Sequence, residues 1–363
     1  MDLSQLEGAY RKWLHLDEDP LLVRILYALI LANRFDSDPV WALVVAAAGG
    51  GKTSLLASMA GSDTALMVST LTPNALASGF GDGSESLLFQ LDGRILIVED
   101  MSSITELTAD ARNQLFSFLR SAYNGAFTKA TGRGTIDWKG KFGFIGGATL
   151  AIESGKKMDG SLGERFLTIR PRMNADDQNA LLDRVMAGAT HKVAQRAELA
   201  QCANEYLSQT FDTTNRNVRK SSVELYKKAA IALSRLRTGA SRDSFTREIS
   251  FPLEVGEMGT RLFTQFLVIA LAAHSMGVAW DEVDAMILRV MLDSVPYARA
   301  RIIRCIHKGQ DEIRTLQPAM HMSQAVVGRH LEELKLLKIL DVSKTRRFEI
   351  ADPIVAFAID NEA

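Results

Sequence analysis

Apolar positions near the start of the chain recur at helical spacing. Leucine, tyrosine and isoleucine side chains fall three or four positions apart through residues 1–35. Because an α-helix has 3.6 residues per turn, positions spaced in this way share one face. The pattern predicts two amphipathic N-terminal helices that pack against the domain that follows them.

Short apolar runs then alternate with segments of helical pattern. This alternation is typical of a parallel sheet covered by helices, because parallel strands need long crossover connections. It predicts an α/β core over residues 36–174. The apolar runs that are expected to form its strands lie at residues 40–47, 64–68, 94–100, 141–152 and 166–169.

The rest of the chain is predicted to be mainly helical, in two further domains. Residues 175–293 have apolar positions at helical spacing, and residues 294–363 have an element order of their own. In this last domain the pattern predicts three helices and then two strands around a basic turn. The helices are expected at residues 298–308, 311–316 and from the N-cap Ser323 to 337, and the strands at 339–350.

Composition and charge exclude several classes of protein. Apolar residues make up 47% of the 363 residues and the formal net charge is −1, so the chain as a whole has no charge bias toward nucleic acid or membrane. Cys202 and Cys305 lack the spacing of a disulfide framework or a zinc site, which favours a reducing cytoplasm. An acidic N-terminus and a short apolar stretch at 21–35, interrupted by Arg24, predict neither a targeting segment nor a membrane span.

Residues 41–56, WALVVAAAGGGKTSLL, have the pattern of a phosphate-binding loop between a strand and a helix. Glycines let backbone N–H groups turn toward phosphate oxygens, and the new helix adds its positive end. Lys52 is expected at the β and γ phosphates of ATP and Thr53 at Mg²⁺. Ala46 stands where glycine usually opens the pattern. The predicted nucleotide-binding residues are Ala47, Ala48, Gly49, Gly50, Gly51, Lys52, Thr53 and Ser54.

The apolar run at 94–100, RILIVED, ends in two carboxylates. ATP hydrolysis needs one acidic group to hold Mg²⁺ and one to orient the attacking water. Neighbouring strand residues point to opposite faces, so the pattern leaves two assignments open. We favour Asp100 as the metal ligand and Glu99 as the water-activating group, the reverse being the alternative, with Glu106 in reserve.

Together with a strand pattern at 142–149, FGFIGGAT, and the residues GERF at 163–166, these motifs resemble the AAA+ ATPases. Among these the chain is similar to minichromosome-maintenance-like helicases and their phage and mobile-element relatives, over about residues 15–350. The resemblance is strong only in the P-loop and the acidic strand. It implies a P-loop core at 36–174, a helical lid at 175–293 and active sites at the subunit interfaces of a ring.

The resemblance also implies three further roles in ATP hydrolysis. Thr149 matches the polar sensor-1 residue at a strand end, which helps to place the attacking water. Arg165 matches an arginine finger that reaches the γ-phosphate of the neighbouring subunit, the alternative being an ion pair with Glu164 or another nearby acidic residue. Arg261, in a segment like the sensor-2 helix, would contact the nucleotide of its own subunit, the alternative being a structural ion pair.

A β-hairpin is predicted around residues 131–134, Thr-Gly-Arg-Gly. In the helicases that the chain resembles, a hairpin at this position enters the central channel and its basic residues hold the DNA backbone. Lys129 and Arg133 are the channel residues implied here. A hairpin on the outer surface, without such a role, is the alternative.

The C-terminal block is locally basic, with eleven Lys or Arg against six Asp or Glu between residues 294 and 350. Its order of elements resembles a winged helix-turn-helix, a fold that binds DNA or docks proteins. Gln324, Arg329 and His330 would face the major groove. Lys344, Arg346 and Arg347 would contact phosphates from the wing.

These features lead to a ring-forming, ATP-hydrolysing DNA motor as the main hypothesis, with hexameric rings of identical subunits acting on single-stranded or forked DNA. A replicative helicase of a phage or mobile element fits this description. One alternative is a non-unwinding AAA+ helicase loader or transposition regulator. Another is a nucleotide-switched regulator or defence ATPase that binds DNA or protein.

Overall fold

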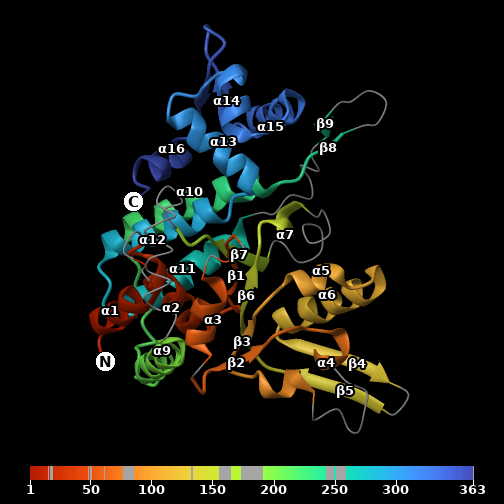
Figure 1. Cartoon of the computed structure of the whole chain (residues 1–363), viewed down its shortest axis with the longest axis vertical. Coiled ribbons are helices and arrows are strands. Elements are labelled where there is room, and N and C mark those ends of the chain that lie inside the picture. Colours follow the sequence, from red (N-terminus) through yellow and green to blue (C-terminus); the bar gives the residue numbers. More distant parts are fainter. Residues whose placement is uncertain are drawn as a thin grey trace. The chain divides into compact units, whose positions relative to one another are not determined.

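The computed structural model divides the chain into two compact units, residues 1–216 with 271–278, and residues 217–270 with 279–363 (Figure 1). The predicted boundaries after residues 35, 174 and 293 stay predictions. The residues that the structure describes are 1–14, 16, 19–47, 49, 51–60, 62–76, 86–131, 134–154, 165–172, 191–242, 249–250 and 259–362.

A parallel five-stranded sheet forms the centre of the first unit. The strand order is β2-β3-β6-β1-β7, so β6 lies between β1 and β3 although it follows both in the sequence. Trp41 pairs with Phe144 on one side and with Phe166 on the other. The predicted α/β core is therefore confirmed. Its strands are β1 (Trp41–Val45), β2 (Ala65–Val68), β3 (Ile95–Val98), β6 (Gly143–Ala148) and β7 (Phe166–Ile169).

Helices cover both faces of this sheet, as Figure 1 shows. On one face, alternate residues such as Trp41, Leu96 and Phe144 join a buried core with α5, α6 and the hairpin of β4 and β5. On the other face α3 lies against β6, and α9 packs on α1 and α3. The elements of this unit are α1 (Leu3–Leu14), α2 (Leu22–Ala32), α3 (Lys52–Met59), α4 (Pro73–Leu76), η1 (Leu87–Gln90), α5 (Ser102–Glu106), α6 (Ala109–Tyr123), β4 (Ala126–Thr131), β5 (Gly134–Lys139), α7 (Ala151–Ser154) and α9 (Lys192–Leu207).

The second unit is mostly helical and includes the C-terminal block. Its helix–helix–helix–hairpin order agrees with the sequence pattern, and Ser323 caps α15 by accepting a hydrogen bond from the Val326 N–H. α14 continues past Pro318 and buries Met320, whereas the sequence predicted an end at residue 316. Pro318 is the sixth of the eight residues of α14 (Ile313–Met320), and its missing N–H removes one backbone hydrogen bond of the helix, a loss that burial can offset.

The remaining bounds are α10 (Lys220–Arg237), β8 (Ser241–Arg242), β9 (Ile249–Ser250), α11 (Thr260–Ser275), α12 (Trp280–Asp293), α13 (Tyr297–His307), α14 (Ile313–Met320), α15 (Gln324–Leu336), β10 (Leu340–Val342), β11 (Phe348–Ile350) and α16 (Pro353–Asp360). The last five residues of α11 belong to the first unit. None of the described helices combines the length and the apolarity that a membrane-crossing helix needs.

Candidate functional site

The glycine-rich loop, residues 46–51, leaves β1 and turns into α3. The Ala46 N–H donates to the Ala148 carbonyl at 3.1 Å, which ties the start of the loop to β6. Gly49 and Gly51 have φ angles of 79° and 67°, in the left-handed region. Any other residue there costs about 1–2 kcal/mol, since its Cβ crowds the following carbonyl. A Cβ at either position would meet no other atom within 4 Å, so conformation and not space selects glycine.

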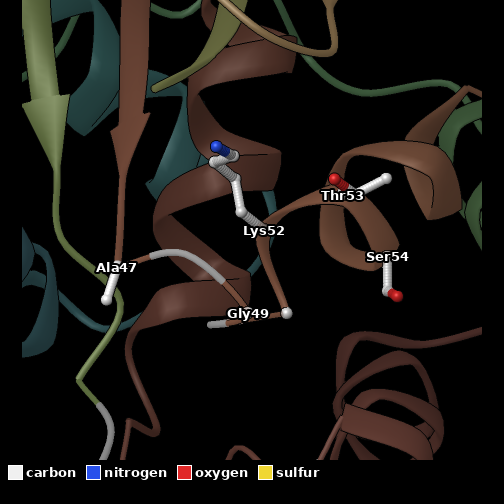
Figure 2. Close-up of a pocket in the computed structure, with 6 residues that line it drawn as sticks. Ala47, Gly49, Lys52, Thr53 and Ser54 are labelled. Carbon is white, nitrogen blue, oxygen red and sulfur yellow. The ribbon is translucent and has the colours of Figure 1, made fainter. Parts of the chain in front are cut away.

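The loop and the first turn of α3 border a hollow of about 260 Å³ (Figure 2). Figure 2 shows the side chains of Lys52, Thr53 and Ser54 at the start of α3, beside Ala47 and Gly49. No side chain caps this helix start, so its first N–H groups are available to an anion. The hollow is therefore lined as a phosphate site requires, and the predicted residues Ala48 and Gly50 lie outside the described ones.

Three neighbouring strands end at the same edge of the sheet as this hollow. β1 leads into the glycine-rich loop, β6 leads into Thr149, and β3 leads into Glu99 and Asp100. Because parallel strands share their carboxyl edge, the order β3-β6-β1 brings these groups together. Segments 50 to 100 residues apart in the sequence thus form one site.

Asp100 is held by the residue two positions further along the chain. The Ser102 N–H donates to Asp100 Oδ1 at 2.9 Å, and the Ser102 hydroxyl donates to the same oxygen. Among the described residues none donates to Oδ2. Burial by itself raises the pKa of Asp100, but the two Ser102 hydrogen bonds and the positive charge of Lys52 outweigh burial and lower it. Asp100 is thus an anion with one oxygen left to accept a cation.

Glu99 has different surroundings. Its N–H donates to the Val68 carbonyl at 2.9 Å, and its Oε2 accepts from the Ser69 hydroxyl at 3.2 Å, at the end of β2. Lys52 thus acts on the pKa of Asp100, and Glu99 is bound to the end of the neighbouring strand. The roles of the two carboxylates toward a metal ion and a water stay predictions. Glu106, the reserve residue, is exposed at the end of α5.

The other predicted ATPase residues are spread over both units. Thr149 is half-buried directly after β6, and its carbonyl accepts from the Ile152 N–H at 3.1 Å. The half-buried guanidinium of Arg165 lies over the Tyr123 ring, 5.4 Å from its centroid, and Glu164 lies outside the described residues. Arg261 is half-buried at the start of α11, in the second unit. The roles of these three residues stay predictions.

No family model matches the chain, and no curated protein matches it. What the protein does must therefore be inferred from its own residues and their geometry. Within the described residues, no three His, Cys, Asp or Glu side chains gather in a group that could hold a metal ion. Mg²⁺ that binds together with a nucleotide needs only one or two protein ligands, because phosphates and water supply the others.

The hairpin predicted before β6 is present, with β4 and β5 paired antiparallel from Ala126↔Lys139 to Thr131↔Gly134. Lys129 lies on the face that packs against α6, with its ammonium 4.9 Å from the centroid of the Phe118 ring. Within the described part of the hairpin, the charged side chains of the outer face are Asp137 and Lys139, which balance. Arg133 lies outside the described residues, and DNA contact by either cation stays a prediction.

The predicted DNA-contact residues of the C-terminal block are exposed, with one exception. Gln324 and Arg329 are exposed on α15. In contrast, His330 is half-buried, with its Nδ1 3.6 Å from Glu333. Burial by itself raises the pKa of Glu333, but the adjacent His330 ring and a hydrogen bond from Arg299 at 2.9 Å outweigh burial and lower the pKa to about 2. His330 thus lies beside Glu333 of the same helix, and its contact with DNA stays a prediction.

The basic turn between β10 and β11 carries three exposed cations, Lys344, Arg346 and Arg347. Arg346 has a φ of 63°, which turns the chain back into β11. Arg347 lies within 4 Å of Asp311 and Glu312, at 3.7 and 3.6 Å. Lys344 and Arg346 are therefore the better placed of the three to meet a phosphate backbone, and their DNA contact stays a prediction.

The sequence did not predict a role in this site for Ser102 or Gly147. A serine two positions after an aspartate can close a local turn onto its carboxylate, and this signal was present in the sequence. A glycine inside a strand often marks the close approach of another backbone. The pair Gly146-Gly147 had that signal, but the identity of the approaching segment depends on the strand order.

Proposed function

We propose that this chain is a Mg²⁺-dependent ATPase with a P-loop core of the AAA+ type. One observation carries the proposal: the glycine-rich loop with Lys52 and the Asp100 carboxylate lie at the same edge of the sheet, and the charge of Lys52 helps to lower the pKa of Asp100. A glycine-lined hollow bordered by a lysine, with an ionised carboxylate at the end of a nearby strand, suits a phosphate with its metal ion.

The residues present fit Mg²⁺ and a nucleotide. Thr53 supplies a hydroxyl and Asp100 an ionised carboxylate, and hard oxygen ligands of this kind are the ones that Mg²⁺ prefers. The left-handed glycines Gly49 and Gly51 keep side chains away from the phosphates, and the start of α3 supplies N–H groups.

From this placement we infer a separate role in ATP hydrolysis for each group of the site. Backbone N–H groups and Lys52 would bind the β and γ phosphates, while Thr53 and Asp100 would hold the metal ion. Bound Mg²⁺ would neutralise the negative charge of the phosphates. Glu99 would orient the attacking water and accept its proton as the bond to the leaving ADP breaks, and Thr149 would help to place that water.

Phosphate release from ATP by the purified chain tests this proposal. The expected result is turnover that requires Mg²⁺ and disappears in EDTA, together with binding of a fluorescent ATP analogue. If the folded protein neither binds the analogue nor releases phosphate, with or without DNA, the proposal is wrong.

We further propose that the active form is a ring of identical subunits that acts on DNA, with the helical segment 175–293 as lid and residues 294–363 as a winged helix. Support comes from the hairpin placed between the acidic strand and β6, and from the exposed basic turn at Lys344 and Arg346. Unwinding of a forked duplex with ATP is the test. No strand separation with either tail polarity would contradict a helicase.

One observation favours the non-unwinding alternative, a loader or a transposition regulator. The described outer face of the hairpin has no net charge, and Lys129 packs against α6. A hairpin face without net positive charge grips a DNA backbone weakly. ATP-dependent assembly on DNA without strand separation would be the result expected of such a protein.

Arg165→Ala tests whether the site is shared between subunits. We expect it to keep nucleotide affinity and lose hydrolysis, because an arginine that acts from a neighbouring subunit is worth about 10³–10⁵ in rate. Mixing Arg165→Ala with a variant that is defective in Lys52 should restore part of the activity, since some interfaces then hold both intact residues. Hydrolysis by Arg165→Ala alone at the wild-type rate would exclude this role.

A further inference from the structure

Gly147 lies in β6 on the face of the sheet that α3 covers. A Cβ at this position would fall 2.4 Å from the Glu99 carbonyl oxygen, 2.7 Å from Leu56 Cδ1 and 3.1 Å from Lys52 Cδ. The first atom belongs to the acidic segment after β3, and the other two belong to α3. The space left free by Gly147 is therefore shared by the helix that carries Lys52 and by the segment that carries Asp100.

The backbone on both sides of this contact is fixed by hydrogen bonds. The Glu99 N–H donates to the Val68 carbonyl at 2.9 Å, and the Met101 N–H donates to the Gly147 carbonyl at 2.7 Å. β6 itself is paired with β1 and β3, and Gly147 lies opposite Val44. A side chain at 147 would press on a carbonyl oxygen held by these bonds and also on Leu56 and Lys52, so both the Glu99 segment and the Lys52 stem would have to shift.

We propose that Gly147 is a positioning residue of the phosphate site, whose missing side chain lets the Lys52 stem lie against β6 beside the Glu99–Asp100 segment. The inference rests on the proposed function, because it takes Lys52 and Asp100 as the groups that hold the nucleotide and its metal ion. Gly147 itself touches neither ligand. It limits where the Lys52 stem can lie, because a Cβ 3.1 Å from Lys52 Cδ would require the stem to give by a few tenths of an ångström. Small displacements of a group that positions the reacting atoms lower the rate.

Gly146 provides a matched control in the same strand. Successive strand residues point to opposite faces, so a Cβ at Gly146 meets Met101 Cγ at 2.7 Å and Leu43 Cδ2 at 3.0 Å, on the face that α5 and α6 cover. These atoms are parts of flexible side chains, which can shift more cheaply than a backbone oxygen. Gly146→Ala therefore adds the same methyl group to β6 without pressing on Lys52.

The experiment compares Gly147→Ala and Gly146→Ala with the wild type in three measurements: the thermal unfolding midpoint, the affinity for a fluorescent ATP analogue, and the rate at which acetic anhydride modifies Lys52, read by mass spectrometry. We expect Gly147→Ala to bind the analogue about tenfold or more weakly and to be acetylated at Lys52 several times faster, because its stem is pushed off β6. Gly146→Ala should keep both values within about threefold of the wild type.

Three results would overturn the inference. One is a folded Gly147→Ala protein with the wild-type affinity and the wild-type rate of Lys52 acetylation. Another is an equal loss of affinity in both variants that follows their unfolding midpoints, which would reduce Gly147 to general packing. The third is a Gly147→Ala chain that does not fold while Gly146→Ala does, because the overlap with the Glu99 backbone would then decide the effect and not the position of Lys52.

Failure of the proposed function can be told apart from failure of this inference. If the wild type binds no ATP analogue, the proposed function is wrong, whereas the acetylation of Lys52 still reports whether Gly147 sets its position. If the wild type binds the analogue and Lys52 is acetylated equally in all three proteins, the proposed function stands and the inference about Gly147 is wrong.

Discussion

Lys52→Ala is expected to weaken ATP binding by about 10- to 140-fold, because hydrogen bonds from a charged group to an anion contribute about 1.5–3 kcal/mol. Hydrolysis should fall further than binding. The Lys52 ammonium lies beside the hollow where the transferred phosphate would gather negative charge, and fixed charges act most strongly on charge that develops during the reaction. Titration with a fluorescent ATP analogue and a phosphate-release assay measure the two effects separately.

Lys139→Ala is the matched control for this experiment. Lys139 is an exposed lysine on the outer face of the hairpin, so its removal changes the net charge equally without altering the hollow. ATP affinity and basal turnover should be unchanged in this variant. Equal turnover in Lys52→Ala and the wild type would place the phosphate site elsewhere in the chain.

Asp100→Asn should reduce Mg²⁺-dependent hydrolysis by at least about a hundredfold, since even groups that only support a metal ligand are worth about 10–100-fold. The amide oxygen can still accept from Ser102, so the local turn at 100–102 should persist. What changes is the charge that faces Lys52 and the metal ion. The dependence of turnover on Mg²⁺ concentration should shift to higher concentrations, which a titration of the rate with Mg²⁺ will show.

Asp137→Asn, on the exposed face of the hairpin, is the control for the Asp100 experiment. It removes one carboxylate charge at a distance from the hollow, so its Mg²⁺ titration should match that of the wild type. If Asp100→Asn behaves like this control while Glu99→Gln abolishes turnover, the two carboxylates have the reverse roles.

The pH dependence of the free energy of unfolding tests the lowered pKa of the Asp100 carboxylate. Because its pKa in the folded protein lies below the ordinary value of 3.8, the ionised carboxylate stabilises the fold above that value. This contribution is lost as the pH falls through the folded-state pKa. Urea unfolding at neutral pH should therefore show Asp100→Asn to be less stable than the wild type, with a difference that shrinks as the pH falls below 3.8. A difference that is constant with pH would contradict the lowered pKa.

Local patterns were sufficient to predict many elements of this protein. The five apolar runs of the core became the five parallel strands, and the glycine run before Lys52 became a loop with two left-handed glycines. The Thr-Gly-Arg-Gly hairpin and the N-cap at Ser323 were also predicted correctly. In each case the signal lies within a few neighbouring residues, because apolar alternation, helix capping and turn chemistry act at that range.

The tertiary structure decided how these elements form a site. Strand alternation says that Glu99 and Asp100 point apart, but only the order β2-β3-β6-β1 shows that Ser69 bonds Glu99 and that Lys52 influences Asp100. The same holds for Lys129, since its stacking on Phe118 depends on which face of the hairpin α6 covers.

The sequence by itself determined that this chain has a strand, a glycine-rich loop and a helix with Lys52 and Thr53 at its start, and that a second strand ends in two acids. Only the tertiary structure decided that β6 lies between those two strands and that Gly147 leaves room for Lys52 and the Glu99 carbonyl. The physical reason is the distance along the chain over which each kind of interaction acts. Capping, turns and side-chain periods are set by adjacent residues, whereas strand order and close approach result from packing between segments far apart in the chain.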